Sequence, residues 1–352
     1  MHLPNWTQSV RSGTTLDQVA AKEILDLLLQ DKVSTEEKVE FLIALTARGE
    51  TADEIAFFAL ALRDLAKPFL ISDEIRKEGF IDLCGTGGDG RNTFNISTCA
   101  SFVIAAAGVK VVKHGNRGIT SKSGGFDVLE ALGIKIDLSP DQALQSLKSN
   151  DLCFLFAQHY HPAFKKLAPL RKEVAARKSR TIFNLVGPLL NPALPPFQLV
   201  GVPHLDLPEK YIQALSKMGI RRGAVVCGRT ETGEAMDELS TLSKSDWWEW
   251  NQGQFKNQKI SPENFSFQKG KASELEVSNA QESAKIIIDI LESKDQSVRR
   301  DMVALNAAGG LFLSDKVKTL EAGINLALEI LASGKAWEKL QQVVEVTSRF
   351  KN

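Results

Sequence analysis

The sequence predicts an α/β fold in which a small helical domain precedes a large α/β domain with a mostly parallel central sheet. Apolar residues recur at helical spacing through the first eighty residues. From Phe80 onward, short apolar runs alternate with helical stretches, and a glycine-rich turn directly follows the first run. The length of 352 residues suits a large domain plus a small one better than a single layered core.

Helical periodicity is clear near the N-terminus. Residues 16–30 are predicted to form a helix with an apolar face made of Leu16, Val19, Ala20, Ile24, Leu27 and Leu28. Two Ser/Thr-x-x-Glu patterns, which begin at Ser34 and Thr51, indicate capping boxes that open two further helices. Because no β-rich segment lies among these helices, we assign residues 1–79 to the helical domain.

The α/β domain is expected over residues 80–352. Its strands are predicted at the apolar runs 80–84, 109–113, 153–157 and 224–227. The prolines of segment 186–206 indicate an ordered crossing segment, part of which returns to the helical domain, with a surface linker as the alternative. The tryptophans of 247–250 are expected to pack against a sheet edge. The apolar spacing of the tail, 317–352, predicts an amphipathic helix on the core.

Composition excludes several classes of protein. The 43 basic and 43 acidic residues cancel, so no long-range field attracts nucleic acid or an anionic membrane. The four cysteines are far apart and contain no Cys-x-x-Cys pair, which indicates small buried side chains in a reducing compartment. The N-terminus has no signal pattern, and the apolar runs are too short to span a bilayer. We therefore expect a cytoplasmic protein.

A glycine-rich turn follows the first predicted strand. Residues 82–90 read Asp-Leu-Cys-Gly-Thr-Gly-Gly-Asp-Gly. Glycines permit positive φ and let backbone amides approach a ligand without a Cβ in the way. The turn lacks both the Gly-x-Gly-x-x-Gly spacing of dinucleotide folds and the Lys-Ser/Thr ending of nucleotide P-loops. Alone it is a weak signal, because many strand-to-helix turns are similar.

The residues after this turn strengthen the signal for phosphate binding. Ser97 and Thr98 precede a small, apolar stretch and are expected to open a helix, whose free amides and positive dipole end would face the turn. After the next predicted strand, residues 113–117 and 120–125 add cations, hydroxyls and glycines at the ligand-binding edge of the sheet. A simple helix cap and a solvated basic loop are the respective alternatives.

One acidic pair and one histidine pair are candidate metal ligands. Asp237 and Glu238 follow the strand at 224–227, and adjacent carboxylates in a loop suit magnesium, which prefers carboxylate and phosphate oxygens. A solvated acidic dipeptide is the alternative. His159 and His161 have no third zinc ligand at a plausible spacing, so we interpret His161 as part of a pocket wall.

Together these segments resemble the anthranilate phosphoribosyltransferase family. The family motifs Gly-Thr-Gly-Gly-Asp, Asn-Ile-Ser-Thr and Lys-His-Gly-Asn-Arg are present here at 85–89, 95–98 and 113–117. The resemblance extends over roughly residues 16–315, through the segments 127–133, 161–163, 180–184, 187–192, 237–238 and 305–307. It implies the nucleoside phosphorylase/phosphoribosyltransferase-like fold and a homodimer.

The resemblance also implies an activity and a set of binding residues. The activity is transfer of the phosphoribosyl group of phosphoribosyl pyrophosphate to anthranilate, in tryptophan biosynthesis, with Mg²⁺ as cofactor. The substrate-binding residues it implies are Gly85, Gly88, Asp89, Thr93, Asn95, Ile96, Ser97, Thr98, Lys113, His114, Gly115, Asn116, Arg117, Ser121, Gly125 and Arg171. Asn116 and Arg171 would hold anthranilate, and Ser97, Asp237 and Glu238 would hold the metal.

The chain departs from the family pattern at several positions. Gly125-Phe126 replaces a common Ser-Ala pair, Gln158 replaces a usual proline, and 173–179 replaces a shorter turn. These changes concern the acceptor more than the sugar donor. The alternatives are therefore a relative with another small aromatic acceptor, a non-catalytic nucleic-acid-binding relative, or a pyrimidine nucleoside phosphorylase.

Overall fold

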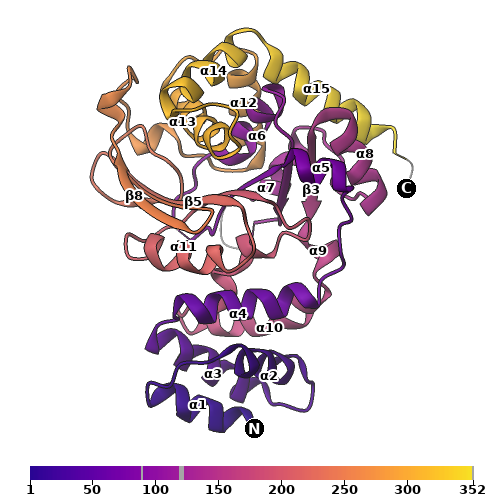
Figure 1. Ribbon diagram of the computed structural model, residues 1–352, viewed down its shortest axis with the longest axis vertical. Helices are drawn as coiled ribbons and strands as arrows, with labels where there is room; N and C mark the ends of the chain where they lie inside the picture. The colour runs from indigo at the N-terminus through magenta and orange to yellow at the C-terminus, as the bar shows by residue number, and fades with distance from the viewer. Residues whose placement is uncertain (89, 119–122, 351–352) are drawn as a thin grey trace.

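The computed structural model describes residues 1–88, 90–118 and 123–350. Helices gather at the N-terminal end of the molecule, below the α/β part in Figure 1. They are α1 (Leu3–Arg11), α2 (Gln18–Leu29), α3 (Thr35–Arg48), α4 (Ala52–Asp64) and, from much later in the chain, α10 (Pro162–Ala176). The contacts of α10 with α2 and α3 were not predicted from the sequence.

The predicted capping boxes are confirmed. Ser34 and Thr51 accept hydrogen bonds from the backbone N–H groups of Glu37 and Glu54, and the carboxylates of both glutamates accept a bond from the backbone N–H of the cap residue. Glu54 is fully buried, where it also accepts from the N–H of Leu16 and pairs with Arg48. One residue of the predicted apolar face was wrong: Val19 is 76% exposed, because α2 turns Ala20, Ile24 and Leu28 inward instead.

Eight strands of the described residues form one sheet, in the order β3-β2-β1-β4-β5-β7-β8, with β6 paired to β5. The first five are parallel, and β6, β7 and β8 are antiparallel to their neighbours. The strands are β1 (Ile81–Gly85), β2 (Val111–Gly115), β3 (Leu152–Phe156), β4 (Phe197–Gly201), β5 (Arg222–Arg229), β6 (Ala235–Met236), β7 (Ser245–Asn251) and β8 (Gln254–Ile260). All four predicted strands are present, and each begins within two residues of its predicted first residue.

Two predictions about the sheet were incomplete or wrong. The proline-rich segment 186–206 contains β4, the strand between β1 and β5, because its prolines lie outside Phe197–Gly201 and leave every ladder N–H of that strand available. The tryptophans do not lie at an edge: β7 is covered by β8, and Trp247 is fully buried in the core. The alternation of buried and part-exposed residues along β7 reflects a strand with one covered face.

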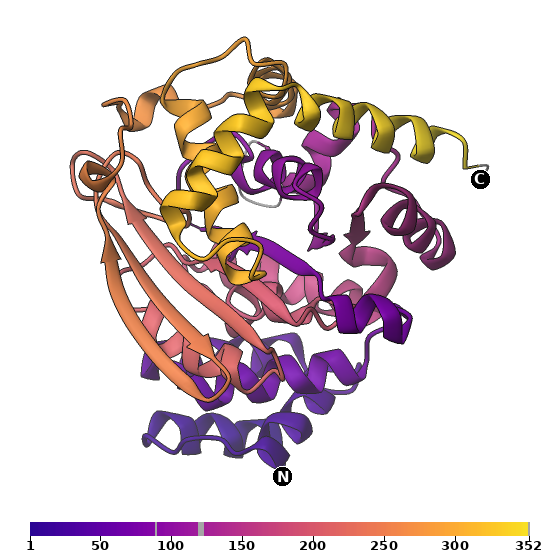
Figure 2. The same ribbon diagram turned by 45° about the horizontal axis from the view of Figure 1, so that its top comes forward.

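Helices cover both faces of the sheet (Figure 2). One face is packed by α6 (Ile96–Ala106) and α13 (Val298–Leu313), with α14 (Leu320–Ala332) and α15 (Lys335–Ser348) packed on these two helices, and the other face is packed by α11 (Pro208–Ser216). The predicted tail helix is thus two helices, both packed on the core. The remaining helices are α5 (Asp73–Glu78), α7 (Gly125–Ala131), α8 (Pro140–Asn150), α9 (Ala157–Tyr160), α12 (Ala280–Leu291), η1 (Ile182–Asn184), η2 (Gly187–Leu190), η3 (Pro262–Asn264) and η4 (Ala272–Glu274).

Two of the hydrophobic cores follow this layering. One lies between the sheet and α6, α12, α13, α14 and α15. The other joins the N-terminal helices and α10 to η1, η2, α11 and the opposite face of the sheet. None of the helices in the described part of the chain combines the length and the apolar character that crossing a bilayer requires.

The two faces of α2 allow a matched test of the fold. Ile24 is fully buried, so Ile24→Ala should lower the free energy of unfolding by about 2–5 kcal/mol through lost burial and a cavity. Val19→Ala should change it by less than about 0.5 kcal/mol, because the side chain is already in water. Urea unfolding of both variants measures this, and equal losses would contradict the assigned helix face.

Candidate active site

The candidate site begins at the glycine-rich turn beyond β1. Gly87, Gly88 and Gly90 have φ of +69°, +92° and +72°, which a side chain would strain. Gly87 and Gly88 are exposed beyond the C-terminal end of a parallel strand. Ligands of open α/β sheets bind at that edge.

A second loop crosses the ends of β1, β4 and β5. The pairing of Met236 in β6 with Gly228 in β5 directs the next two residues over the neighbouring strands. Asp237 accepts a hydrogen bond from the N–H of Gly87 through Oδ2, at 3.0 Å, across 150 residues of sequence. The structure therefore brings the predicted carboxylate and the predicted phosphate turn together.

Glycines at three strand ends make this crossing possible. A Cβ on Gly201, the last residue of β4, would lie 1.6 Å from the carbonyl oxygen of Asp237. On Gly85 it would lie 2.2 Å from Oδ2 of Asp237, and on Gly228 it would lie 2.3 Å from the carbonyl oxygen of Glu238. No side chain other than hydrogen fits at these positions unless the loop moves.

Lys113 connects β2 to the start of α6. Its ammonium group donates to the carbonyl oxygen of Leu83 in β1 and, at 3.1 Å, to Oγ of Ser97. Ser97 lies in the first turn of α6, where backbone N–H groups have no partner within the helix. Ile96 and Thr98 beside it are buried. A cation, a hydroxyl and a helix start therefore meet near the glycine turn, an arrangement that suits a phosphate.

Asn95 is fixed by serines from two distant segments. Its Oδ1 accepts from Oγ of Ser123 at 2.7 Å and from Oγ of Ser283 at 2.8 Å, and its Nδ2 donates to the carbonyl of Ser123 at 3.2 Å. Next to it, Thr93 forms an isolated bridge with Glu276. The segment between the glycine turn and α6 is therefore held on both sides. The sequence alone gave no signal for Ser283, which is 188 residues away.

A buried carboxylate lies beneath the turn. Asp82 in β1 is fully buried and accepts from Nδ2 of Asn191 at 2.8 Å and from the N–H of His114 at 3.4 Å. Burial raises the pKa of Asp82 to about 6, and the charge of Lys113 and these hydrogen bonds oppose the rise. The same Asn191 nitrogen also donates to the carbonyl of Val112 at 2.8 Å, so one amide links β1 to β2.

Aromatic rings join the end of β2 to α10. The ring of His114 lies 5.0 Å from that of His161, which lies 6.0 Å from the ring of Phe164. The guanidinium of Arg171 is 5.9 Å from the centroid of Phe164. Burial lowers the pKa of both histidines, that of His161 to about 4, so both rings are neutral at neutral pH. Their Nε2 atoms are buried without a hydrogen-bond partner among the described residues.

The other predicted residues after β2 have separate contacts of their own. Oδ1 of Asn116 accepts from the N–H of Arg117 at 2.8 Å and from Nε2 of Gln158 at 3.4 Å. Arg117 is exposed and forms ion pairs with Glu130 and Asp127 of α7. A Cβ on Gly125 would lie 3.9 Å from Oγ1 of Thr98, so the starts of α7 and α6 are neighbours.

Phe126 does not cover the phosphate turn. It is 2% exposed, belongs to the core of the α/β part and stacks on Phe156 with ring centroids 5.1 Å apart. A Cβ on Gly115 would meet its ring at 3.0 Å, so glycine at the end of β2 accommodates the larger side chain. Two further predicted residues, Asp89 and Ser121, lie outside the described part of the chain.

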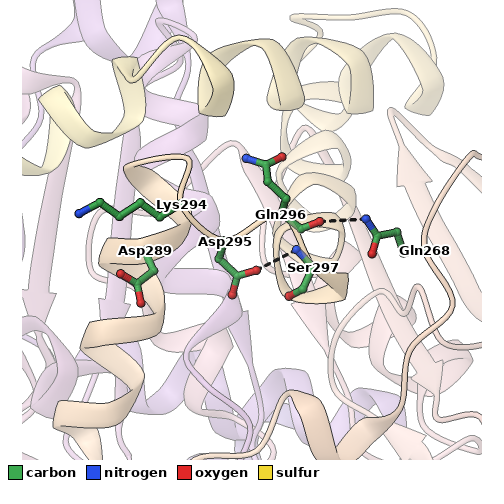
Figure 3. A pocket seen from close by; sticks show the side chains of 6 residues that line it. All are labelled: Gln268, Asp289, Lys294, Asp295, Gln296 and Ser297. Carbon is green, nitrogen blue, oxygen red and sulfur yellow. Dashed lines mark hydrogen bonds between the residues drawn. The ribbon is translucent and has the colours of Figure 1, made fainter.

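Figure 3 shows a different hollow, of about 620 Å³, at the turn between α12 and α13. Its polar groups bond to one another: the N–H of Ser297 donates to Asp295 at 2.8 Å, and Nε2 of Gln268 donates to the carbonyl of Gln296 at 3.0 Å. None of the predicted site residues lines it. It lies at the opposite end of α12 from Ser283, which contacts Asn95, and is not the candidate site.

The donor set fits magnesium only in part. Asp237 and Glu238 are half-buried hard-oxygen ligands. Within residues 1–88, 90–118 and 123–350, no group of three His, Cys, Asp or Glu side chains is placed to hold a metal ion. Because Mg²⁺ takes six oxygens and usually keeps several waters, two carboxylates leave positions for water and phosphate oxygens. This is the pattern of a metal that binds together with a phosphorylated substrate.

Both parts of the chain match a known family. Residues 4–66 match the helical bundle domain, and residues 77–337 the a/b domain, of the glycosyl transferase family. The anthranilate phosphoribosyltransferase of Petrotoga mobilis is 40% identical over 343 residues, which are 97% of this chain and 96% of that protein. The enzyme of Shewanella frigidimarina is 42% identical over 328 residues, 93% and 92% of the two chains.

The chain belongs to the anthranilate phosphoribosyltransferase family. Solved structures agree with this assignment. The enzyme of Thermus thermophilus superposes with a TM-score of 0.87 at 34% identity, over 97% of this chain and 99% of that one. That of Saccharomyces cerevisiae, solved in complex with PRPP and Mg, gives 0.84 at 25% identity over 99% and 98% of the two chains. The predicted fold class and family are therefore confirmed.

Residues that support the site without being predicted are mainly glycines. Gly201 and Gly228 hold no ligand, yet they let the loop of Asp237 and Glu238 lie on the strand ends. The sequence does contain an indication of the strand end at Gly201, because this glycine follows an apolar run that is as long as a strand. Asn191 lies in the proline-rich segment, and its long-range contacts with Asp82 and Val112 have no local signature.

The glycine contact gives a direct prediction. Gly201→Ala should lower the free energy of unfolding by about 1–3 kcal/mol, because the new methyl group overlaps the backbone of Asp237. Gly187→Ala is the matched control, since a Cβ there meets nothing within 4 Å and its φ is not positive, and we expect a change below about 0.5 kcal/mol. Chemical unfolding of both variants tests the contact; a neutral Gly201→Ala would show that the loop does not lie on β4.

The buried Asp82 predicts a pH dependence. Since its pKa is higher in the folded chain than in an unfolded one, where Asp titrates near 4, the folded state binds the proton more tightly. The wild type should therefore lose stability relative to Asp82→Asn as the pH rises from about 4 to about 6, and the difference should level off above that range. Urea unfolding at a series of pH values measures it. Parallel stability curves for the two proteins would refute the raised pKa.

Proposed function

We propose that this protein transfers the phosphoribosyl group from phosphoribosyl pyrophosphate to anthranilate, with N-(5-phosphoribosyl)anthranilate and pyrophosphate as products, in tryptophan biosynthesis. The observation that carries the proposal is the hydrogen bond between the N–H of Gly87 and Asp237, since the turn would bind phosphate and this carboxylate would bind the metal. The relatives named above support the choice of substrates.

Phosphoribosyl pyrophosphate, the donor, would bind between the glycine turn after β1 and the first turn of α6. The amides of Gly85, Gly88 and Asp89 would bind its pyrophosphate, together with the first turn of α6 at Ser97. Lys113 would add the charge that a diphosphate requires. Thr93, Asn95, Ile96, Thr98, Gly115, Ser121 and Gly125 would complete the donor site through hydroxyl, amide and backbone contacts.

Magnesium would bind between the donor and the two acids. Asp237 and Glu238 would each supply a carboxylate oxygen and Ser97 a hydroxyl, with the remaining ligands from water and the donor's phosphates. The yeast relative was solved with PRPP and Mg, which supports this use of the metal. The bound ion would neutralise the negative charge that grows on the departing pyrophosphate.

Anthranilate would bind against the aromatic residues between β2 and α10. Arg171 keeps its charge although burial lowers its pKa, and its planar guanidinium can donate two parallel bonds to the carboxylate. Asn116 would position the ring from the other side. The neutral, unpartnered Nε2 atoms of His114 and His161 lie in the same cluster and would gain partners from a polar ligand. The yeast relative was solved with 4-fluoroanthranilate.

Catalysis would come from alignment and charge stabilisation. The aromatic amine of anthranilate is largely unprotonated at neutral pH and needs no strong base to attack the ribose carbon. The chain's own groups therefore need only hold the two substrates in line and stabilise the charges of the transition state, with Lys113 and the turn amides on the pyrophosphate side. No residue is assigned as a general acid or base.

We also propose that the protein works as a cytoplasmic homodimer joined through its helical domain, residues 1–79. Leu70 lies on that domain with 76% of its surface exposed, and all four cysteines are free thiols. The mass of the particle in solution, one chain or two, decides the oligomeric part.

The metal assignment predicts a large and specific loss. Asp237→Ala combined with Glu238→Ala should reduce magnesium-dependent turnover by at least about 100-fold, because the charge on the leaving pyrophosphate is no longer offset. The matched control is Glu321→Ala, an exposed carboxylate in the first turn of α14, which should stay within about twofold of the wild type. Product formation from the donor and anthranilate is measured over a magnesium titration.

The outcomes of this assay separate the alternatives. Unchanged turnover in the double variant would remove the metal role from these acids. Turnover with another aromatic amine and none with anthranilate would keep the fold and donor but replace the acceptor. Phosphorolysis of a nucleoside by inorganic phosphate, without metal dependence, would overturn the proposed function.

A further inference from the structure

A second cavity lies at the N-terminal ends of the central strands β4 and β5, whereas the candidate active site is built at C-terminal strand ends. It has a volume of about 300 Å³ and is lined by Arg63, Arg76, Pro188, Leu189, Asn191, Leu194, Pro195, Gln198, Met218, Gly219 and Ile220. Most of these residues precede a strand: 188–195 lie before β4, and 218–220 before β5. The cavity therefore lies where β4 and β5 begin, whereas the glycine turn lies where β1 ends, and a strand of five residues spans about 16 Å.

Two arginines reach this cavity from separate helices. Arg63 lies in the last turn of α4, and its Nη1 donates to the carbonyl of Met218 at 3.2 Å. Arg76 lies in α5, and its Nη1 donates to the carbonyl of Ala193 at 3.4 Å. Each contact uses one nitrogen of a guanidinium that carries five N–H donors, so most of the donors of both groups remain available.

Neither arginine forms an ion pair with a described residue. Among the described residues, no carboxylate oxygen lies within 4.0 Å of either guanidinium; the other arginines of the N-terminal helices, Arg11 and Arg48, each form an ion pair. Burial lowers the pKa of Arg63, and the nearby charge of Asp64 opposes the shift. A partly desolvated cation without an ion-pair partner favours an anion in the space it faces.

The rest of the wall sets the kind of anion. Pro188, Leu189, Pro195, Met218 and Ile220 are apolar, whereas Asn191 and Gln198 contribute amides already engaged in internal hydrogen bonds. An inorganic anion would leave this apolar surface uncovered. The volume is at the lower end of the range for small-molecule pockets, about 300–1,000 Å³. The shape and chemistry therefore suit a carboxylate carried on a compact apolar body.

We propose that the cavity between α4, α5 and the starts of β4 and β5 binds a small apolar carboxylate, with Arg63 and Arg76 holding its charge. The cavity is distinct from the donor turn, which lies beyond the opposite ends of the strands, and from the acceptor cluster, whose Arg171 and Phe164 do not line it. The site is therefore a separate binding site for a small metabolite of this class.

The test uses 4-bromobenzoate as the probe on the whole chain. Calorimetry should show binding that Arg63→Gln and Arg76→Gln each weaken by about tenfold, the loss of one charged hydrogen bond. Arg63→Lys should retain part of the affinity. Arg11→Gln is the control, because Arg11 is an exposed arginine of α1, and should bind as the wild type does. In crystals soaked with the probe, anomalous scattering should place bromine between the two arginines.

Acceptor-site binding is separated by Arg171→Gln. That variant should lose any bromine beside Phe164 and keep the one in this cavity, whatever the outcome for the proposed function. Bromine beside Phe164 alone, or binding at crystal concentration only, would overturn the inference. Equal affinity for 4-bromobenzamide would remove the role of charge, and equal affinity for inorganic phosphate would remove the role of the apolar wall; either result contradicts the assignment.

Discussion

The arrangement of the site depends on close backbone contact at the ends of three parallel strands. Gly201, Gly85 and Gly228 lack the Cβ that would collide with the loop of Asp237 and Glu238, which can therefore lie directly on the sheet. Asp237 then reaches the N–H of Gly87. A carboxylate loop and a phosphate turn that are far apart in sequence become neighbours because three residues have no side chain.

The parallel sheet supplies the second constraint. The C-terminal ends of parallel strands lie on the same side of the sheet. The turn after β1, the segment after β2 and the loop near β5 are therefore close together in space. Below this edge, buried polar groups keep the strands in place: Asn191 bridges Asp82 and Val112, and Lys113 bonds to β1. Within this network the carboxylate of Asp82 is removed from water, which disfavours its charged form and raises its pKa.

Much of the fold could be predicted from the sequence, because the helix starts and several strands depend on interactions between residues that are close together in the chain. The capping boxes at Ser34 and Thr51 and the strands beginning near Phe80 and Ala224 depend on residues within one element. The glycine turn and the acid pair were also recognisable, since their chemistry is carried by adjacent residues. Their roles as ligands of the donor and the metal remain proposals.

Features determined by tertiary contacts could not be predicted in this way. β4 lies among prolines, and only its two neighbouring strands reveal it as central. Val19 fits the apolar spacing of α2 yet is exposed, because none of the described elements packs over it. The support of Asn95 by Ser283 and the joining of His114 to Arg171 through aromatic rings connect segments without any local pattern.

The central claim is that the crossing loop and the glycine turn form one site for a metal and a diphosphate. A crystal structure of this chain grown with phosphoribosyl pyrophosphate and Mn²⁺ in place of Mg²⁺ tests it most directly, because anomalous scattering locates the metal. The account predicts metal at about 2.0–2.3 Å from oxygens of Asp237 or Glu238 and of the diphosphate, with the diphosphate on the amides of the turn. A diphosphate bound elsewhere, or a metal without contact to either acid, would contradict it.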